Sequence, residues 1–330
     1  MILAGDVGGT NTRLAFFTLQ HGQLQAIVAE TFRSRQQTNL ESLVRRFVAS
    51  HRQPIERACF GVAGPIRHGR CEATNLAWVV DARRLARELC LDRVWLINDL
   101  EANAYGIAIL SSDDFVTLNQ GAANASGNAA IIAAGTGLGE AGLYWDGVAH
   151  RPFATEGGHA TFAPSNALQA ELLRYLMEQG KYDHISWERV VSGPGIYTIY
   201  RFLRDTGRGD EPRWLREQIL QGDPAPVIAQ AALSGTSPLC EQTLDLFIAL
   251  YGAEAGNLAL KIMATGGMYI GGGIAPKIIK KLRTSTFMEA FIAKGRLQPL
   301  LQDIPVRVIL NDKTALLGAA RYAMLQGSSL

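Results

Sequence analysis

The chain has 330 residues, of which 48% are hydrophobic and 19% are charged; this composition is typical of a folded globular protein with about two domains. Lys and Arg number 32, and Asp and Glu number 30, which leaves a formal charge of +2. Since no basic block accompanies this charge, we expect neither a nucleic-acid partner nor binding to an anionic membrane.

The sequence also argues against a membrane segment and a disulfide scaffold. No apolar run approaches the roughly 18 residues of a membrane span, and Met1–Asp6 has neither the basic nor the long apolar region of a signal peptide. The four cysteines form no C-x-x-C pair, and no His lies at zinc-ligand spacing, so reduced thiols are predicted. We therefore expect a cytoplasmic protein.

The first 110 residues alternate between predicted strands and helices. They open with an apolar strand at 2–4, a glycine-rich turn at 5–11 and a second apolar strand at 12–17. The elements predicted after these are a helix over 40–50, a strand over 58–63, a helix from its cap at 81 to 90, a strand over 94–97 and a helix over 100–110. This order predicts an α/β domain with a mixed sheet.

A polar stretch, 119–128, precedes a second region that repeats this pattern. A strand over 129–134, a turn over 135–139 and an apolar run over 141–145 follow it, and Gly9-Thr10 of the first turn recurs as Gly135-Thr136. A duplicated domain is therefore expected, although two copies alone do not establish a repeat. The remaining predictions are helices over 168–178, 189–204, 239–263, 276–293 and 314–325, a strand over 306–310, and loops over 206–212 and 222–226.

The first turn, Gly5-Asp6-Val7-Gly8-Gly9-Thr10-Asn11, contains the groups that a nucleotide site needs. Gly8 and Gly9 can expose backbone N–H donors, and the Thr10 hydroxyl and Asn11 amide can contact phosphate oxygens. Asp6 can hold Mg²⁺ directly or through water. The alternative is an ordinary hairpin turn whose Asp bonds its own backbone. The second turn, Gly135-Thr136-Gly137, supplies further donors and favours the phosphate interpretation.

The run from Gly137 to Gly142 formally matches the dinucleotide pattern G-x-G-x-x-G. That pattern needs a helix that begins at the turn, whereas residues 143–147 predict a strand and a turn. We therefore do not expect a dinucleotide site here, and the Walker pattern is absent from the sequence.

Asn98-Asp99 ends one predicted strand and opens a helix. Ligands of open α/β sheets collect outside the carboxyl ends of strands, so this carboxylate is placed to orient a hydroxyl and accept its proton. Helix capping by Asn and Asp is the alternative.

Glu156-Gly157-Gly158-His159 presents a carboxylate and an imidazole on a predicted loop. The glycine pair disfavours the helix that an E-x-x-H metal site would need, and the two side chains suit vicinal hydroxyls. A turn with two solvated polar residues is the alternative. Glu188 would ordinarily be assigned to the solvated surface. The turn at 271–276 is open enough for an adenine or ribose, although alone it is a weak signal.

Taken together, these motifs resemble those of the bacterial glucokinase family, in the hexokinase–actin–chaperone ATPase superfamily. The resemblance rests on six segments in the family's order: 6–11, 97–99, 135–139, 156–159, 188–195 and 271–276. It implies two RNase H-like (actin-like ATPase) α/β domains with mixed sheets flanking a central cleft. These would be residues 1–110 plus 311–330, and residues 111–310. It also implies ATP-dependent 6-phosphorylation of glucose, Mg²⁺ and a homodimer.

The resemblance also implies a role for each motif residue. Asp99 would be the base at the sugar 6-hydroxyl, and Asn98 would bond neighbouring hydroxyls. Glu156, His159 and Glu188 would bind hydroxyls toward the anomeric end, and Gly137 would contact both sugar and phosphate. Asp6 would assist Mg²⁺. The nucleotide-binding set would comprise Gly5, Asp6, Val7, Gly8, Gly9, Thr10, Asn11, Gly135, Thr136, Gly137, Gly272 and Gly273.

Two further expectations concern residues next to these motifs. Some related sugar kinases carry a cysteine-rich zinc loop where this chain has residues 160–164, so no structural zinc is expected. Glu140 follows the second turn directly. Because a carboxylate there would repel phosphates, we expect it to point to solvent.

Two other functions remain open on the sequence. One is a kinase for another hexose, such as mannose or fructose. The other is a non-catalytic sugar-sensing regulator, which generally needs a DNA-binding module. No helix-turn-helix pattern with basic residues stands out. Asp6 and Asp99 are also both present, although a sensor would be free to lose them.

Overall fold

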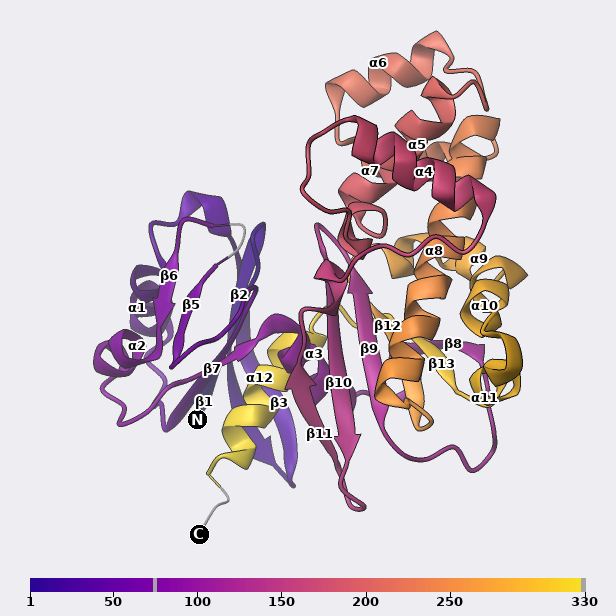
Figure 1. Cartoon of the computed structure of the whole chain (residues 1–330). Coiled ribbons are helices and arrows are strands. Elements are labelled where there is room, and N and C mark those ends of the chain that lie inside the picture. Colours follow the sequence, from indigo (N-terminus) through magenta and orange to yellow (C-terminus); the bar gives the residue numbers. More distant parts are fainter. Residues whose placement is uncertain (74–75, 328–330) are drawn as a thin grey trace. The chain divides into compact units, whose positions relative to one another are not determined.

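The computed structural model describes residues 1–73 and 76–327. The chain divides into two compact units (Figure 1). The first unit comprises residues 1–112, 151–154 and the chain from 311 onward, and the second comprises 113–150 and 155–310. Among the described residues, no helix has the length and apolar character that crossing a membrane requires.

The first unit is built on a mixed five-stranded sheet. Its strands, in hydrogen-bonded order, are β3 (Gln23–Arg33), β2 (Asn11–Gln20), β1 (Ile2–Val7), β4 (Arg57–Val62) and β7 (Trp95–Asn98). β1, β4 and β7 are parallel, while β2 runs antiparallel to both of its neighbours. The expected mixed sheet is therefore present, and β3 is a strand that the sequence prediction omitted.

Helices cover both faces of this sheet because successive strand residues point to opposite sides. Leu3 packs in one cluster with α1 (Leu40–His51) and α2 (Ala82–Leu89). Its neighbours Ile2 and Ala4 pack in another with α3 (Asp99–Ile107) and α12 (Thr314–Leu325). The smaller elements of this unit are η1 (Ser34–Gln36), β5 (Arg70–Glu72) and β6 (Val79–Asp81).

Glycine permits the close approach of α3 and α12. A Cβ atom at Gly318 would overlap the Ala102 carbonyl, and one at Gly106 would overlap the Thr314 carbonyl. The apolar α12 therefore lies against α3 and completes the first unit.

The second unit is built on a sheet in which five strands follow in order. They are β10 (Leu138–Trp145), β9 (Ala129–Ala134), β12 (Gly267–Gly271), β13 (Val306–Ile309) and β8 (Phe115–Asn119). β9, β12 and β13 are parallel, and β10 and β8 run antiparallel to their neighbours. Residues 151–154 of β11 (His150–Ala154) belong to the first unit, and the chain returns to the second unit at Thr155.

A long helix, α8 (Pro238–Ile262), forms the centre of the second unit's core. Ser237 caps it by accepting a hydrogen bond from the Cys240 N–H at 3.3 Å. The other elements are η2 (Ser112–Asp114), η3 (Gly157–His159), α4 (Ala167–Glu178), η4 (Trp187–Arg189), α5 (Gly193–Asp205), α6 (Arg213–Gln221), α7 (Pro224–Leu233), η5 (Ala275–Ile278), α9 (Ile279–Leu282), α10 (Ser285–Ile292), η6 (Gly295–Leu297) and α11 (Gln298–Gln302).

The helix predicted over 276–293 was wrong as a single element. It is broken into η5, α9 and α10, because Thr284 adopts an extended conformation (φ −73°, ψ 166°) between the last two. The loop predicted over 222–226 was also too long. Asp223 accepts a hydrogen bond from the Ala225 N–H at 3.3 Å, and Pro224 opens α7. Likewise, α5 begins at Gly193 rather than at 189.

Candidate functional site

The carboxyl ends of β1, β4 and β7 meet at one edge of the first sheet. In the parallel registers Val7 lies opposite Val62, and Val62 opposite Asn98. The turn after β1 and the Asn98-Asp99 pair after β7 therefore share an edge. This is the position where open α/β sheets bind ligands.

The first glycine-rich turn is held by Ser34, a residue that the sequence analysis did not identify. The Gly8 N–H donates to the Asn11 carbonyl at 3.0 Å and closes the turn. The Ser34 hydroxyl donates to the Gly8 carbonyl at 2.7 Å, and the Ser34 N–H donates to the Thr10 carbonyl at 3.0 Å. These contacts hold the backbone carbonyls of the turn in place. Thr10 remains exposed to solvent.

Not every residue of the first motif is available to a ligand. Gly5 and Val7 are buried in β1, where a Cβ at Gly5 would overlap the Phe60 ring and Val7 belongs to the hydrophobic core. Gly5 and Val7 therefore build the strand that leads into the turn. Asn11 opens β2, and its side-chain oxygen accepts from Arg33 at 3.3 Å.

Asp6 lies at this edge with its side chain 19% exposed, and Arg13 Nη1 lies 3.5 Å from its Oδ2. Arg13 also donates through Nη2 to Asp312 at 2.7 Å. Burial raises the pKa of Asp6 to about 6, and Arg13 opposes that rise. Mg²⁺ prefers carboxylate and phosphate oxygens. A single carboxylate beside a glycine-rich turn fits such an ion when phosphates complete its shell.

Asn98 caps the helix that Asp99 opens. The Asn98 amide oxygen accepts the N–H of Leu100 at 2.9 Å and of Glu101 at 3.4 Å, and its Nδ2 donates to Gly64 at 3.2 Å. The capping interpretation therefore applies to Asn98. Asp99, half-buried, is the first residue of α3, where the helix dipole favours an ionised carboxylate.

In the second unit, the turns after β9 and β12 lie side by side, since Ala133 is opposite Gly271 in the parallel register. Gly272 has φ +83°, and a Cβ atom there would overlap the Ala134 carbonyl. Only glycine fits this conformation and this approach. The Gly135–Gly137 turn and the exposed Gly272-Gly273 pair are thus brought together at one edge.

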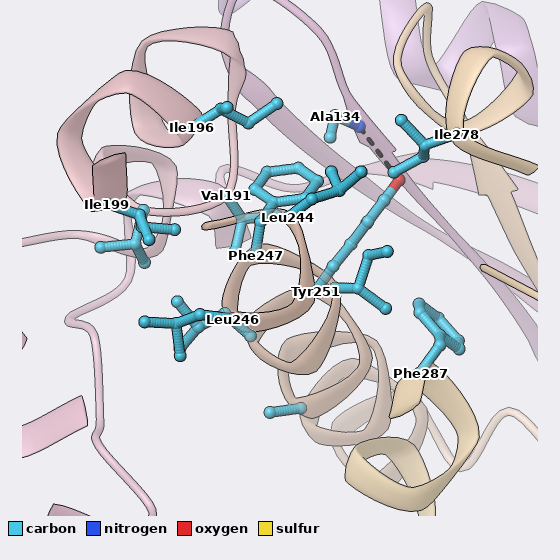
Figure 2. Packing of buried hydrophobic residues seen from close by; sticks show 14 of the residues in the cluster. Ala134, Val191, Ile196, Ile199, Leu244, Leu246, Phe247, Tyr251, Ile278 and Phe287 are labelled. Carbon is cyan, nitrogen blue, oxygen red and sulfur yellow. Dashed lines mark hydrogen bonds between the residues drawn. The ribbon is translucent and has the colours of Figure 1, made fainter. Parts of the chain in front are cut away.

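Tyr251 of α8 fastens these two strand ends, and sequence reasoning missed it. Its hydroxyl accepts the Ala134 N–H at 3.2 Å, the bond drawn in Figure 2. The same hydroxyl lies within donating distance of the carbonyls of Gly271 (3.2 Å) and Ile132 (3.3 Å). A lone Tyr within a long apolar helix was the available signal, because a buried hydroxyl needs a partner.

Glu188 lies against the second turn. Its Oε2 accepts the Leu138 N–H at 3.1 Å, and a Cβ atom at Gly137 would overlap the same oxygen. The Gly135 carbonyl accepts the Gly193 N–H at 2.8 Å, which ties the turn to the start of α5. A side chain at position 137 would therefore displace the Glu188 carboxylate from the turn.

Glu156 precedes η3 and His159 is its last residue, and η3 lies against the start of β10. A Cβ atom at Gly158 would overlap the Leu138 carbonyl, and the Trp187 N–H donates to Ala160 at 3.0 Å. His159 Nε2 lies 4.0 Å from Glu156 Oε2, and their side chains are 51% and 57% exposed. The exposed side chains of Glu156 and His159 and the half-buried Glu188 thus come from two segments of one unit, 156–159 and 187–189, that both contact Leu138.

The prediction that Glu140 points to solvent was wrong, since the residue is only 1% exposed. On β10 it lies opposite Ile132, and it points toward Glu254 of α8, which is fully buried. Burial and the Glu254 carboxylate raise the pKa of Glu140 to about 8. The argument from phosphate repulsion assumed an ionised side chain, whereas burial and the neighbouring Glu254 favour the protonated form of this one.

Among the described residues, no group of three or more His, Cys, Asp and Glu side chains is arranged to hold a metal ion. This finding concerns only metal sites in which the protein supplies three or more of the ligands. A cation held by one carboxylate and substrate phosphates would not form such a group.

A family model described as Glucokinase matches residues 3–326. A glucokinase from Trichormus variabilis is 44% identical over 337 residues, covering 98% of both chains. One from Synechocystis is 42% identical over 341 residues, covering 96% of both.

A solved structure of a glucokinase is also similar to this chain. A glucokinase from an Antarctic psychrotroph is 32% identical, with a TM-score of 0.84 and 98% of both chains covered. The expected α/β fold with mixed sheets is confirmed by this match. The chain belongs to the glucokinase family.

Proposed function

We propose that this protein transfers the γ-phosphoryl group of ATP to the 6-hydroxyl of glucose, giving glucose 6-phosphate and ADP. The observation that carries the proposal is the grouping of Glu156, His159 and Glu188 beside the second glycine turn. Family membership supports it. A Balamuthia mandrillaris glucokinase was solved with glucose, and a Streptomyces griseus ROK-family glucokinase with glucose and AMPPNP.

Asp99 would act as the base. Its carboxylate, at the start of α3, would accept the proton of the 6-hydroxyl as that oxygen bonds to the γ-phosphorus. The bond from the γ-phosphorus to the bridging oxygen then breaks, and ADP leaves. Asn98 uses its amide oxygen as the helix cap, so its contribution to the sugar would come through the Nδ2 group.

Glu156, His159 and Glu188 would bind the hydroxyls toward the anomeric end of the sugar. A carboxylate accepts hydrogen bonds, and an imidazole can donate or accept, so together they select a pattern of vicinal hydroxyls. The Leu138 N–H fixes one Glu188 oxygen at 3.1 Å. This carboxylate is therefore oriented before the sugar arrives, which lowers the entropy cost of binding.

The two turns would contact the phosphates through Gly8, Gly9, Thr10 and Asn11, and through Gly135, Thr136 and Gly137. The exposed Gly272 and Gly273 would lie near the nucleoside. Asp6 would hold Mg²⁺, which when bound neutralises charge on the β- and γ-phosphate oxygens. Arg13, 3.5 Å from Asp6, would keep the carboxylate in place.

The organisation of the protein is also part of the proposal. The kinase domains would be residues 1–110 plus 311–330 and residues 111–310, and the working form would be a cytoplasmic homodimer. Sedimentation of the purified protein across a concentration series tests the dimer. A single monomer mass at all concentrations would contradict it.

The test of the activity is sugar-dependent ADP release with Mg-ATP, using glucose, mannose, fructose, galactose and N-acetylglucosamine. Asp99→Ala is the inactivating variant, and Asp113→Ala, at an exposed aspartate, is its matched control. Release that is strongest with glucose and lost only in Asp99→Ala would support the proposal. Preference for another hexose would revise the substrate, and no release from folded protein would contradict kinase activity. Calorimetric glucose binding without release would then indicate a sensor.

A further inference from the structure

A pair of buried carboxyl groups lies beneath the loop that carries Glu156 and His159. Glu140 of β10 is 1% exposed and Glu254 of α8 is fully buried. Glu254 accepts hydrogen bonds from Asn257 Nδ2 at 2.8 Å and from Lys261 Nζ at 3.4 Å. Lys294 Nζ donates to Asn257 Oδ1 at 2.6 Å. Glu254 therefore has the donors that a buried carboxylate requires.

Glu140 does not share those donors. Its Oε1 has no hydrogen-bond partner among the described residues. Burial with one oxygen unpartnered favours the protonated carboxyl group, and its proton can then be directed at the Glu254 carboxylate. The raised pKa of Glu140, caused by burial and by Glu254, agrees with this geometry.

Both the backbone and the side chain of Glu140 support the loop above. The Thr155 hydroxyl donates to the Glu140 carbonyl at 2.9 Å and accepts the Gly157 N–H at 3.2 Å. The Glu140 carboxyl fills the space next to Gly157, where a Cβ atom would overlap Oε2. Glu156 and His159 lie one and two residues away from Gly157, so a shift of Glu140 would move both.

We propose that Glu140 is a positioning residue for the sugar, which fixes the loop 155–159 so that Glu156 and His159 meet the hydroxyls at the correct angle. This inference rests on the proposed function, because it assumes that these two side chains bind glucose. Glu140 itself touches the loop and not the sugar.

Ionisation of Glu140 provides a second way to disturb the loop. From α8 it is faced by Glu254, Lys261 and Tyr251. β9 presents Ile132 and η3 presents Gly157 at the contact, and neither side chain titrates. Lys294 lies near Glu254. Above about pH 8, a second negative charge beside Glu254 is expected to push the carboxyl groups apart and weaken glucose binding.

The experiment compares Glu140→Ala and Glu140→Gln with wild type, with Glu178→Ala as the control at an exposed glutamate. The KM values for glucose and ATP, kcat, and glucose affinity by calorimetry are measured from pH 6.5 to 9. For Glu140→Ala, the glucose KM is expected to rise about tenfold, while the ATP KM stays within about twofold. Glu140→Gln, neutral and of similar size, should match wild type at pH 7 and lack its rise in glucose KM above pH 8.

Several results would overturn the inference. They are a Glu140→Ala variant with the wild-type glucose KM, equal losses for glucose and ATP, or a Glu140→Gln variant as impaired as Glu140→Ala. If Glu140→Ala does not fold, the pH comparison of wild type with Glu140→Gln still decides, and identical profiles would contradict the inference. Wild-type protein that neither binds nor phosphorylates glucose would instead contradict the proposed function.

Discussion

The two glycine-threonine turns share a sequence signal but are held in different ways. The first is fixed by Ser34, which directly follows β3, the strand paired with β2. The second is fixed by Glu188, by Gly193 and, at the end of β9, by Tyr251. A local turn motif therefore specifies the shape of both turns, while only the second depends on residues far away in the chain.

The two edges also differ in chemistry. The first carries acids, Asp6 and Asp99, which would act on the reacting groups. The second carries Glu156, His159 and Glu188, which would bind the sugar and orient it. Mutation of Asp99 at the first edge should therefore change turnover, and mutations at the second should change affinity or stability.

The largest effect is expected from Asp99→Asn, which keeps the shape of the side chain but removes the base. We expect kcat to fall about 10³-fold, or about 4 kcal/mol in barrier, while glucose affinity changes little. Single-turnover phosphorylation and calorimetry measure the two quantities. A kcat near that of wild type would remove Asp99 from the chemistry.

Asp6 provides a pH test at the same edge. Its folded pKa of about 6 lies above the unfolded value of 3.8, so its contribution to stability is present below pH 4 and is lost as the pH rises through 6. The free energy of unfolding of wild type, relative to Asp6→Asn, should fall by about 2 kcal/mol between pH 4 and pH 7.5. Urea titrations without nucleotide, with Asp113→Asn as control, measure this difference. A constant difference across the range would show that burial does not raise the pKa of Asp6.

Tyr251→Phe tests the distant support of the second turn. Removing the hydroxyl leaves the buried Ala134 N–H and the Gly271 carbonyl without this partner. The free energy of unfolding should therefore fall by about 2 kcal/mol. Tyr144→Phe, at a half-exposed tyrosine, should be nearly neutral. Equal stabilities of the two variants in urea would indicate that the hydrogen bonds of the Tyr251 hydroxyl contribute nothing to stability.

His159→Ala should give the smallest of these effects and one confined to the sugar. Loss of one hydrogen-bonding group is expected to weaken glucose binding about tenfold, or 1.4 kcal/mol, while the ATP KM is unchanged. Calorimetry with glucose checks the affinity. A rise in the ATP KM instead would assign His159 to the nucleotide.

Much of this arrangement could be predicted because the signals are local. Apolar runs bounded by glycine identified β1, β9 and their turns, and Asp81 identified the start of α2. Glu156 and His159 were singled out by their glycine loop, with a solvated turn as the alternative. Glu188 could be identified only through the resemblance, because alone it is typical of a solvated surface.

What could not be predicted depends on tertiary packing. Whether Glu140 faces solvent or core depends on α8, which lies more than 90 residues later in the chain and covers that side of β10. Ser34 and Tyr251 act on backbone atoms of other segments, and no sequence spacing identifies such partners. The break at Thr284 likewise occurs within a segment of helical periodicity.

The place of α12 in the first unit has a consequence for synthesis on the ribosome. One face of the first sheet, with Ile2, Ala4 and Phe17, is covered in part by residues 315–323. At about 5–20 residues per second, this face waits roughly 15 to 60 seconds for its covering helix to be translated. The nascent chain must carry an open apolar surface for that time, so chaperone binding during translation should concentrate on the first unit and end when α12 emerges.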